Sequence, residues 1–331
     1  MSSDFVSGQE LSRQFYVEAV RPLLGDLPHS AALLGRGSEV LGYDDEMSAD
    51  HNWEPRVVLF LREDDPSVMD VLRDKVPSRF ADRPTDLGVH TLRGYFLAQL
   101  NFDLDREIEA RDWLTFSEQN LCMVTAGAVF HDEVGLEAVR ERFAYYPRDV
   151  WFYLLMAGWW RIHPEVNLVG RSGFVGDELG SALIGARLVQ DLMQLCFLLE
   201  RRYAPYAKWF GTAFARLSCG PSLSSILRTV LRAESWQERE EALMAAYDEV
   251  ARIHNALQIT PAVEVGVEQL WGRPFKVVWG DFIGALSAQI QDPAVKDLAE
   301  RWPAGGVDQL RETLWFARAR PQLLAVFDTA R

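Results

Sequence analysis

The segment from Gly37 to Arg56, which reads GSEVLGYDDEMSADHNWEPR, constrains the fold and function of this chain more than any other part. It carries six carboxylates in twenty residues and lies between two short apolar runs. Clustered carboxylates repel one another unless a cation or a proton lies between them. The strand-like run from Val57 to Leu61 follows directly. The segment therefore predicts a metal or phosphate site at the edge of a sheet.

Length, charge and cysteine usage limit the class of protein. The chain has 331 residues, enough for two domains or one large one, and its 48% of hydrophobic residues suffices for a real core. Its net charge of −14 argues against nucleic-acid binding, which needs a basic face. The three cysteines lie far apart without a CxxC pair, as in reduced cytoplasmic proteins. The N-terminus lacks signal-peptide features and the apolar run over 150–160 is too short to span a bilayer. We therefore expect a cytoplasmic protein without a membrane partner.

Apolar spacing predicts a mixed first half and a helical second half. In the first half we expect strands at 31–34, 56–62 and 88–96, another short apolar element at 127–130, and helices at 9–24 and 66–76. In the second half the spacing predicts only helices, at 136–143, 150–162, 177–199, 205–217, 224–233 and 236–257. The predicted fold class is α/β, with a small mixed-sheet domain at 1–135 and a C-terminal helical domain at 136–331. No flexible linker separates them, so we expect the helical domain to pack tightly and close a cleft.

The acidic segment resembles the nucleotidyltransferase superfamily of the DNA polymerase β type. A Gly37-Ser38 turn is followed a dozen residues later by Ser48-x-Asp50-His51-Asn52, which leads into a strand. The resemblance implies that the turn holds the terminal phosphates of a nucleotide, that Asp50 is the first metal carboxylate and that Asn52 fills the second position. Residues i and i+2 on a strand point to the same face, so both side chains reach one pair of cations. Such a pair clamps the attacking and leaving oxygens of a phosphoryl displacement.

The resemblance is closer to a bacterial family of largely uncharacterised nucleotidyltransferase-like proteins. That family typically reads Asp-His-Asp-Trp-Gly-Pro-Arg where this chain has Asp50 to Arg56. The similarity runs from about residue 30 to beyond Asp308-Gln309, nearly the whole chain. Later segments that carry it are Gly170-Arg171, Gly176-Asp177, Leu198-Leu199, Arg202-Tyr203, Pro205-Tyr206, Lys208-Trp209 and His254-Asn255.

The sequence departs from the family pattern at Asn52, where Asp is expected, and at Glu54, where Gly is expected. An Asn carbonyl ligates Mg²⁺ but contributes no charge. Active superfamily members usually have a third acidic strand position, whereas the expected third strand offers His90 and no carboxylate. The carboxylates that remain as substitutes are Asp44, Asp45, Glu46 and Glu54. Two interpretations stay open: one metal with an adjusted ligand set, or a fold reused for another ligand or reaction.

Several further side chains are candidates for binding or catalysis. His51 lies between the two presumed ligands and is either a supporting group or base, or a hydrogen-bonded core histidine. Arg171, Asp177 and Lys208 are candidate substrate-binding residues because they lie in the segments that carry the resemblance. A guanidinium also grips phosphate in a bidentate way, and Lys208 has aromatic neighbours. The structural alternative is that Asp177 caps its helix and Lys208 pairs with a neighbouring acid. His131-Asp132, after a short apolar run, is a further candidate to face the cleft.

The resemblance and these residues predict a metal-dependent nucleotidyltransferase that uses Mg²⁺ or Mn²⁺. Its partners are expected to be a nucleoside triphosphate and a small-molecule acceptor, whose hydroxyl loses a proton to a carboxylate or to His51. One alternative is a repurposed scaffold that acts on a different small molecule without nucleotidyl transfer. Another is a non-catalytic nucleotide binder.

Overall fold

The computed structural model describes residues 5–50, 53–301, 303, 305–310, 320 and 324. At residues 49, 50, 73 and 310 it describes the backbone. The chain divides into two compact units. Unit 1 comprises Met1–Ile108, Phe116–Ala144 and Trp315–Pro321, and unit 2 comprises Glu109–Thr115, Tyr145–Leu314 and Gln322–Arg331. The closing of a cleft by the helical part stays a prediction.

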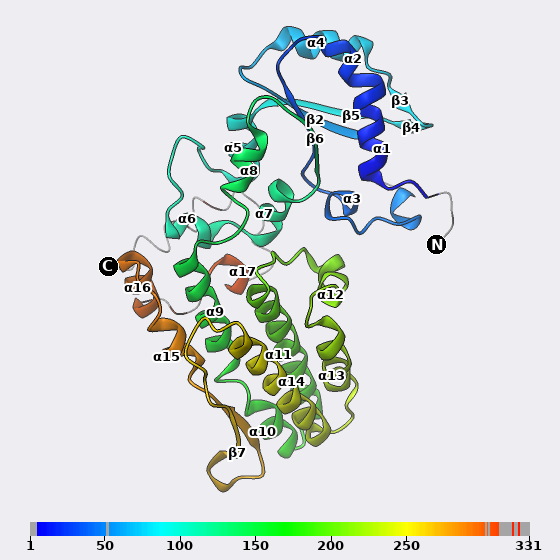
Figure 1. Ribbon diagram of the computed structural model, residues 1–331. Helices are drawn as coiled ribbons and strands as arrows, with labels where there is room; N and C mark the ends of the chain where they lie inside the picture. The colour runs from blue at the N-terminus through cyan, green and yellow to red at the C-terminus, as the bar shows by residue number, and fades with distance from the viewer. Residues whose placement is uncertain are drawn as a thin grey trace. The chain divides into compact units, whose positions relative to one another are not determined.

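Unit 1 contains a four-stranded mixed sheet in the order β5-β2-β1-β6 (Figure 1). The strands are β1 (Ser30–Leu33), β2 (Arg56–Leu61), β5 (Asp86–Thr91) and β6 (Ala128–Asp132). β1 is antiparallel to β2 and to β6, whereas β2 is parallel to β5. Consequently β1 ends where β2, β5 and β6 begin. We call this the site end of the sheet, because the Gly37–Arg56 segment leaves β1 and enters β2 there.

The N-terminal helical segment covers one face of this sheet (Figure 1). It consists of α1 (Gly8–Phe15), a π-helical turn η1 (Tyr16–Val20) and α2 (Arg21–Leu24), so the helix predicted at 9–24 is confirmed with a change of winding in its middle. Its buried side chains join α4 (Pro66–Lys75) and the inward residues of the strands in one apolar cluster: Phe15, Tyr16, Val20, Leu24, Ala31, Val57, Leu59 and Leu72. Val57 and Leu59 are two residues apart and therefore share a face.

The opposite face packs against α5 (Leu92–Leu100), where the rings of Phe60 and Tyr95 meet edge-on with centroids 5.2 Å apart. The strand predicted at 88–96 is wrong in its second half, because β5 ends at Thr91. The Thr91 hydroxyl accepts a hydrogen bond from the Gly94 amide at 3.1 Å and so caps α5. A threonine N-cap stops a strand and starts a helix despite the apolar residues that follow.

The other short elements of unit 1 are α3 (Ser38–Leu41), the 3₁₀ turn η2 (Met47–Asp50), the hairpin β3 (Arg79–Phe80) and β4 (Arg83–Pro84), α7 (Glu118–Thr125) and α8 (Leu136–Glu141). The structure confirms the strands predicted at 31–34 and 56–62 and the helices predicted at 66–76 and 136–143, with small shifts in their boundaries. They are confirmed because apolar spacing determines them.

Unit 2 is built mainly of helices. They are α6 (Ala110–Thr115), α9 (Arg148–Ile162), α10 (Leu168–Phe174), α11 (Glu178–Leu199), α12 (Ala207–Ala215), α13 (Gly220–Arg232), α14 (Trp236–Ala256), the 3₁₀ turn η3 (Leu270–Gly272), α15 (Phe282–Ser287), α16 (Pro293–Arg301) and α17 (Val307–Leu310). The prediction of helices alone is wrong at one place, where β7 (Gly266–Gln269) pairs antiparallel with β8 (Lys276–Trp279). The fold class is therefore α/β, with a small mixed sheet followed by a helical C-terminal part.

Helix α11 is the most apolar long helix among the described residues. By length and composition alone it is able to cross a membrane. Half of its apolar stretch is buried inside unit 2, where it packs against α9, α13 and α14. A core helix passes the same test, so this feature is weak evidence for a membrane span.

Candidate functional site

The Gly-Ser turn lies just beyond the last residue of β1, at the site end of the sheet. Gly37 has φ +136°, a conformation that L side chains rarely adopt, and a Cβ atom there would lie 2.1 Å from Oε1 of Glu39. Glycine is therefore required by both conformation and space. Ser38 follows as the first residue of α3, and it is half-buried.

A buried ion pair lies directly behind this turn. Nη2 of Arg56, the first residue of β2, is 2.8 Å from Oε1 of Glu39, which is 1% exposed. The same guanidinium nitrogen donates a hydrogen bond to the carbonyl of Arg36. Burial raises the pKa of Glu39, and the positive charge of Arg56 offsets part of that shift. The pair thus ties the start of β2 to both sides of the Gly-Ser turn.

Two acidic residues of the segment hold the loop together. Oδ2 of Asp44 accepts hydrogen bonds from the Gly8 amide at 2.7 Å and from the Trp53 indole at 2.9 Å. Oδ1 of Asp45 accepts from the amide and the hydroxyl of Ser48, at 2.8 Å and 3.0 Å. From the sequence, both carboxylates are candidate substitute metal ligands. In the structure, each accepts hydrogen bonds that stabilise the loop.

The predicted metal ligands fall at the limit of the described chain. Asp50 is the last residue of η2, and β2 begins only at Arg56. The strand geometry expected for Asp50 and Asn52 is therefore wrong at Asp50. The reason is local, because the hydrogen bonds from Ser48 to Asp45 turn the chain into a 3₁₀ helix. The side chain of Asp50, together with His51 and Asn52, lies outside the described residues. Their roles as base and metal ligands stay predictions.

Sequence reasoning missed a carboxylate at the same end of the sheet. Asp86 is the first residue of β5 and is the cross-strand partner of Arg56 in the parallel β2–β5 pair. Its neighbours Leu87 and Val89 pack into the apolar cluster, so exposed Asp86 faces the opposite side. Apolar Leu87 and Val89 alternate with Gly88 and His90 in the sequence, and this period of two predicts a strand that begins near Asp86. The third strand therefore does begin with a carboxylate, contrary to the prediction.

The three candidate residues of unit 2 lie in helices or directly before one. Asp177 caps α11, since Oδ1 accepts from the Gly180 amide at 2.7 Å and Oδ2 from the Ser172 hydroxyl at 3.2 Å. Exposed Arg171 in α10 donates to the side chain of Asn167 at 3.2 Å. Exposed Lys208 in the first turn of α12 places its ammonium 4.8 Å from the Trp209 ring centroid. The capping alternative describes Asp177 correctly, and substrate binding by all three stays a prediction.

Comparison with known proteins gives a partial match. Residues 113–210 match the model of a domain of unknown function (DUF4037), a range that includes Arg171, Asp177 and Lys208. Among solved structures, the chain is similar to a nucleotidyltransferase-like protein from Exiguobacterium sibiricum 255-15. The sequence identity is 10% and the TM-score 0.34, over 82% of this chain and 97% of the other. No curated protein matches the chain.

Proposed function

We propose that this protein is a metal-dependent nucleotidyltransferase that transfers a nucleoside monophosphate from a nucleoside triphosphate to a small-molecule acceptor. The observation that supports it best is the convergence of three features at the site end of the sheet. These are the Gly37-Ser38 turn, the η2 turn that ends at Asp50, and Asp86 at the start of β5. A metal–triphosphate complex needs an anion-binding turn and oxygen donors in one place.

The surroundings of the turn favour phosphate. The missing side chain of Gly37 makes room for the Glu39 carboxylate, and the Ser38 hydroxyl at the start of α3 is a hydrogen-bond donor for a phosphate. The neighbouring carboxylate, Glu39, is paired with the guanidinium of Arg56 at 2.8 Å. A phosphate at the turn therefore meets little repulsion from the residue behind it.

The donor set suits Mg²⁺ or Mn²⁺. Asp50, Asn52 and Asp86 would hold the ion, because carboxylate and amide oxygens are the ligands these cations prefer. Asp86 takes the third acidic position, since Asp44 and Asp45 are engaged in the loop. When bound, the ion supplies charge stabilisation to the reacting phosphoryl oxygens.

The chain's own groups supply the remaining functions. His51 or a neighbouring carboxylate accepts the proton of the acceptor hydroxyl. Arg171 and Lys208 bind anionic groups of the substrates, and Asp177 caps the beginning of α11. The net charge of −14 favours a small acceptor over a nucleic acid.

A pyrophosphate-release assay tests this function. The protein is incubated with ATP, GTP, CTP or UTP, with Mg²⁺ or Mn²⁺, and with pools of hydroxyl- and amino-bearing small molecules. We expect pyrophosphate together with a product in which a nucleotidyl group replaces one hydrogen of the acceptor. Asp50→Ala should abolish both, whereas Asp64→Ala, which removes an exposed carboxylate beyond the other end of β2, should not. Release that is unaffected by Asp50→Ala would contradict the proposed site.

A second candidate function is that of a repurposed scaffold that binds a different small molecule. Asn52 supports it, because an amide adds no charge to a Mg²⁺ site. The Asn52→Asp variant separates the candidates. If transfer increases sharply, the protein is an attenuated transferase. If triphosphates bind but neither the wild type nor Asn52→Asp releases pyrophosphate, the protein is a non-catalytic nucleotide binder. If no triphosphate binds, the scaffold serves another ligand.

A further inference from the structure

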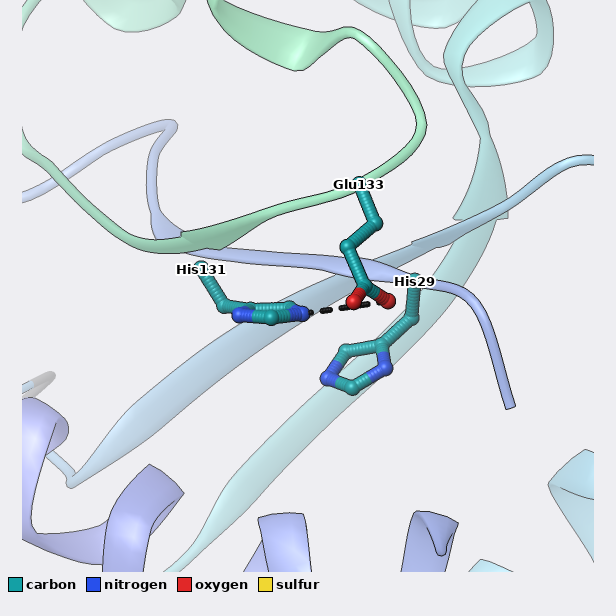
Figure 2. A group of neighbouring side chains, drawn as sticks. All are labelled: His29, His131 and Glu133. Atoms are coloured by element: carbon teal, nitrogen blue, oxygen red, sulfur yellow. Dashed lines mark ion pairs between the residues drawn. The ribbon is translucent and has the colours of Figure 1, made fainter. Parts of the chain in front are cut away.

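Three potential metal ligands meet at the end of β1 that lies away from the Gly-Ser turn. They are His29, His131 and Glu133, whose ligating atoms all lie within 4.8 Å of one another (Figure 2). Nε2 of His131 is 3.2 Å from Oε2 of Glu133, and the two imidazole centroids are 4.6 Å apart. No two of these residues are adjacent in sequence, so strand pairing is what gathers them.

The register of β1 and β6 explains the cluster. Ala31 pairs with His131 and Ser30 with Asp132, and the Glu133 amide then donates to the His29 carbonyl at 3.1 Å. His29 is therefore directly opposite Glu133 and diagonal to His131. Residues i and i+2 of a strand share a face, so all three side chains lie on the same side of the sheet.

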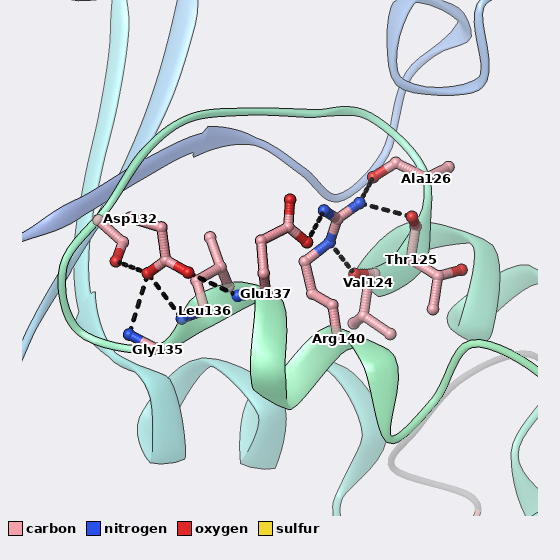
Figure 3. A network of polar contacts seen from close by, with 9 residues as sticks. Val124, Thr125, Ala126, Asp132, Gly135, Leu136, Glu137 and Arg140 are labelled. Atoms are coloured by element: carbon pink, nitrogen blue, oxygen red, sulfur yellow. Dashed lines mark hydrogen bonds and ion pairs between the residues drawn. The ribbon is translucent and has the colours of Figure 1, made fainter.

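The intervening carboxylate, Asp132, points elsewhere. Its two oxygens accept hydrogen bonds from the Ser30 hydroxyl and from the amides of Gly135, Leu136 and Glu137 at the start of α8 (Figure 3). Asp132 thus anchors the loop that follows β6 and fixes the position of Glu133. The carboxylate of the cluster is the one that the strand alternation directs toward the histidines.

The hydrogen bonds of His29 select the tautomer that a metal ligand requires. Nδ1 lies 2.7 Å from the carbonyl of Leu27, and because a carbonyl only accepts, Nδ1 carries the proton. The lone pair of the neutral ring is then on Nε2, which faces the Tyr16 hydroxyl at 2.8 Å. An imidazole whose other nitrogen donates to a backbone carbonyl is the usual arrangement of metal-bound histidine.

We propose that His29, His131 and Glu133 form a binding site for a divalent transition-metal ion of the zinc type. Two imidazoles and one carboxylate suit Zn²⁺, whereas Mg²⁺ prefers oxygen ligands alone. Ligand atoms in a tetrahedral zinc site lie about 3.4 Å apart, so small side-chain rotations complete the site. The fourth position is taken by water, and the ion replaces the Tyr16 hydroxyl at Nε2 of His29.

Access and position indicate a structural role for this ion. His29 is 4% exposed, whereas the side chains of His131 and Glu133 are 24% and 52% exposed, so an ion reaches the site from solvent. The ion would join β1 to the edge strand β6 and hold the end of the sheet closed. This site does not depend on the proposed transferase function, since it lies beyond the first residue of β1 and the Gly-Ser turn lies beyond its last.

Calorimetric titration of the untagged, EDTA-treated full chain with Zn²⁺ tests the proposal, with Co²⁺ absorption as a spectroscopic report of tetrahedral coordination. We expect one Zn²⁺ per chain, a higher unfolding temperature with Zn²⁺, and no competition from Mg²⁺. His131→Ala and Glu133→Gln should each weaken binding by about tenfold or more. His90→Ala, which removes an exposed histidine of the same sheet, is the matched control and should bind as the wild type.

Tyr16→Phe separates a metal site from a cluster that is merely hydrogen-bonded. This variant removes the hydroxyl that occupies Nε2 of His29, so it should increase the Zn²⁺-dependent rise in unfolding temperature. The proposal is overturned if the wild type binds no Zn²⁺. It is equally overturned if His131→Ala and Glu133→Gln retain wild-type affinity, because the ion would then be held elsewhere, for example by the acidic segment. Circular dichroism of each variant shows that the comparison is between folded proteins.

Discussion

Replacing Arg56 by methionine tests the buried ion pair that anchors the Gly-Ser turn. Methionine keeps much of the side-chain volume but leaves Glu39, which is 1% exposed, without its counter-charge. Removal of one partner of a buried pair costs about 3–5 kcal/mol. The Arg56 side chain is 20% exposed, so its own desolvation is incomplete, and Glu39 is able to take up a proton instead. We therefore expect the Arg56→Met variant to lose about 3 kcal/mol of unfolding free energy at pH 7, the lower end of that range.

The loss should depend on pH, and the raised pKa of Glu39 sets the sign. Burial already raises this pKa above its ordinary value of 4.5. A raised carboxyl pKa contributes stability that is complete below the unfolded-state value and is lost as pH rises through the folded-state value. Removal of Arg56 raises the folded-state pKa further, so stability falls by up to about 1.4 kcal/mol per pH unit across the widened interval. The deficit relative to the wild type should therefore shrink as the pH falls toward 5.

Urea denaturation at several pH values between 5 and 8 measures both effects. Arg13→Met is the matched control, because Arg13 pairs with Glu10 at 2.6 Å but is 51% exposed, and its loss should be below about 0.5 kcal/mol. The double variant Glu39→Gln/Arg56→Met should recover part of the deficit, since no buried carboxylate remains. A loss under about 1 kcal/mol at pH 7, or one that is equal at every pH, would refute the reasoning.

Four further predictions follow from single residues. Asp86→Asn should reduce Mg²⁺-dependent triphosphate affinity in calorimetry by about tenfold without shifting the unfolding temperature; unchanged affinity would remove Asp86 from the ligand set. Asp132→Asn should lower stability to urea by about 2 kcal/mol, because the carboxylate accepts four hydrogen bonds, and a neutral result would contradict its anchoring role. Asp177→Ala should cost about 1 kcal/mol in the same assay through loss of the α11 cap, and a value near zero would deny that cap. Burial lowers the pKa of His254 from 6.5 to about 4, so the free energy of unfolding should decrease as pH falls through this interval. His254→Gln should flatten this pH dependence of the unfolding free energy. If the variant and the wild type have the same pH dependence, other groups cause it.

Much of the fold was predictable because apolar spacing determines it. The strands that became β1 and β2 are short uninterrupted apolar runs, whereas the helix α4 and the long helices of unit 2 have apolar residues at helical spacing. The junction of β5 and α5 was mispredicted because apolar residues continue across it, and a single cap at Thr91 decides where the helix begins. The β7–β8 hairpin was missed because its strands are short and mostly exposed.

The candidate site was predictable only where a local motif marks it. Gly37-Ser38 was found from its residue types, and the φ of Gly37 agrees with a turn that only glycine adopts easily. The Glu39–Arg56 pair and the alignment of Asp86 with Arg56 depend on strand register. The cluster of His29 with His131 depends on pairing between segments about 100 residues apart, which periodicity does not reveal.

Calorimetric titration with ATP, GTP, CTP and UTP, each with and without Mg²⁺, tests the central claim most directly. We predict that at least one triphosphate binds at a single site, that binding requires the metal, and that Asp50→Ala abolishes it while the unfolding temperature stays the same. Absence of binding by every triphosphate, in the presence of Mg²⁺ or Mn²⁺, would contradict the assignment of this protein as a nucleotidyltransferase.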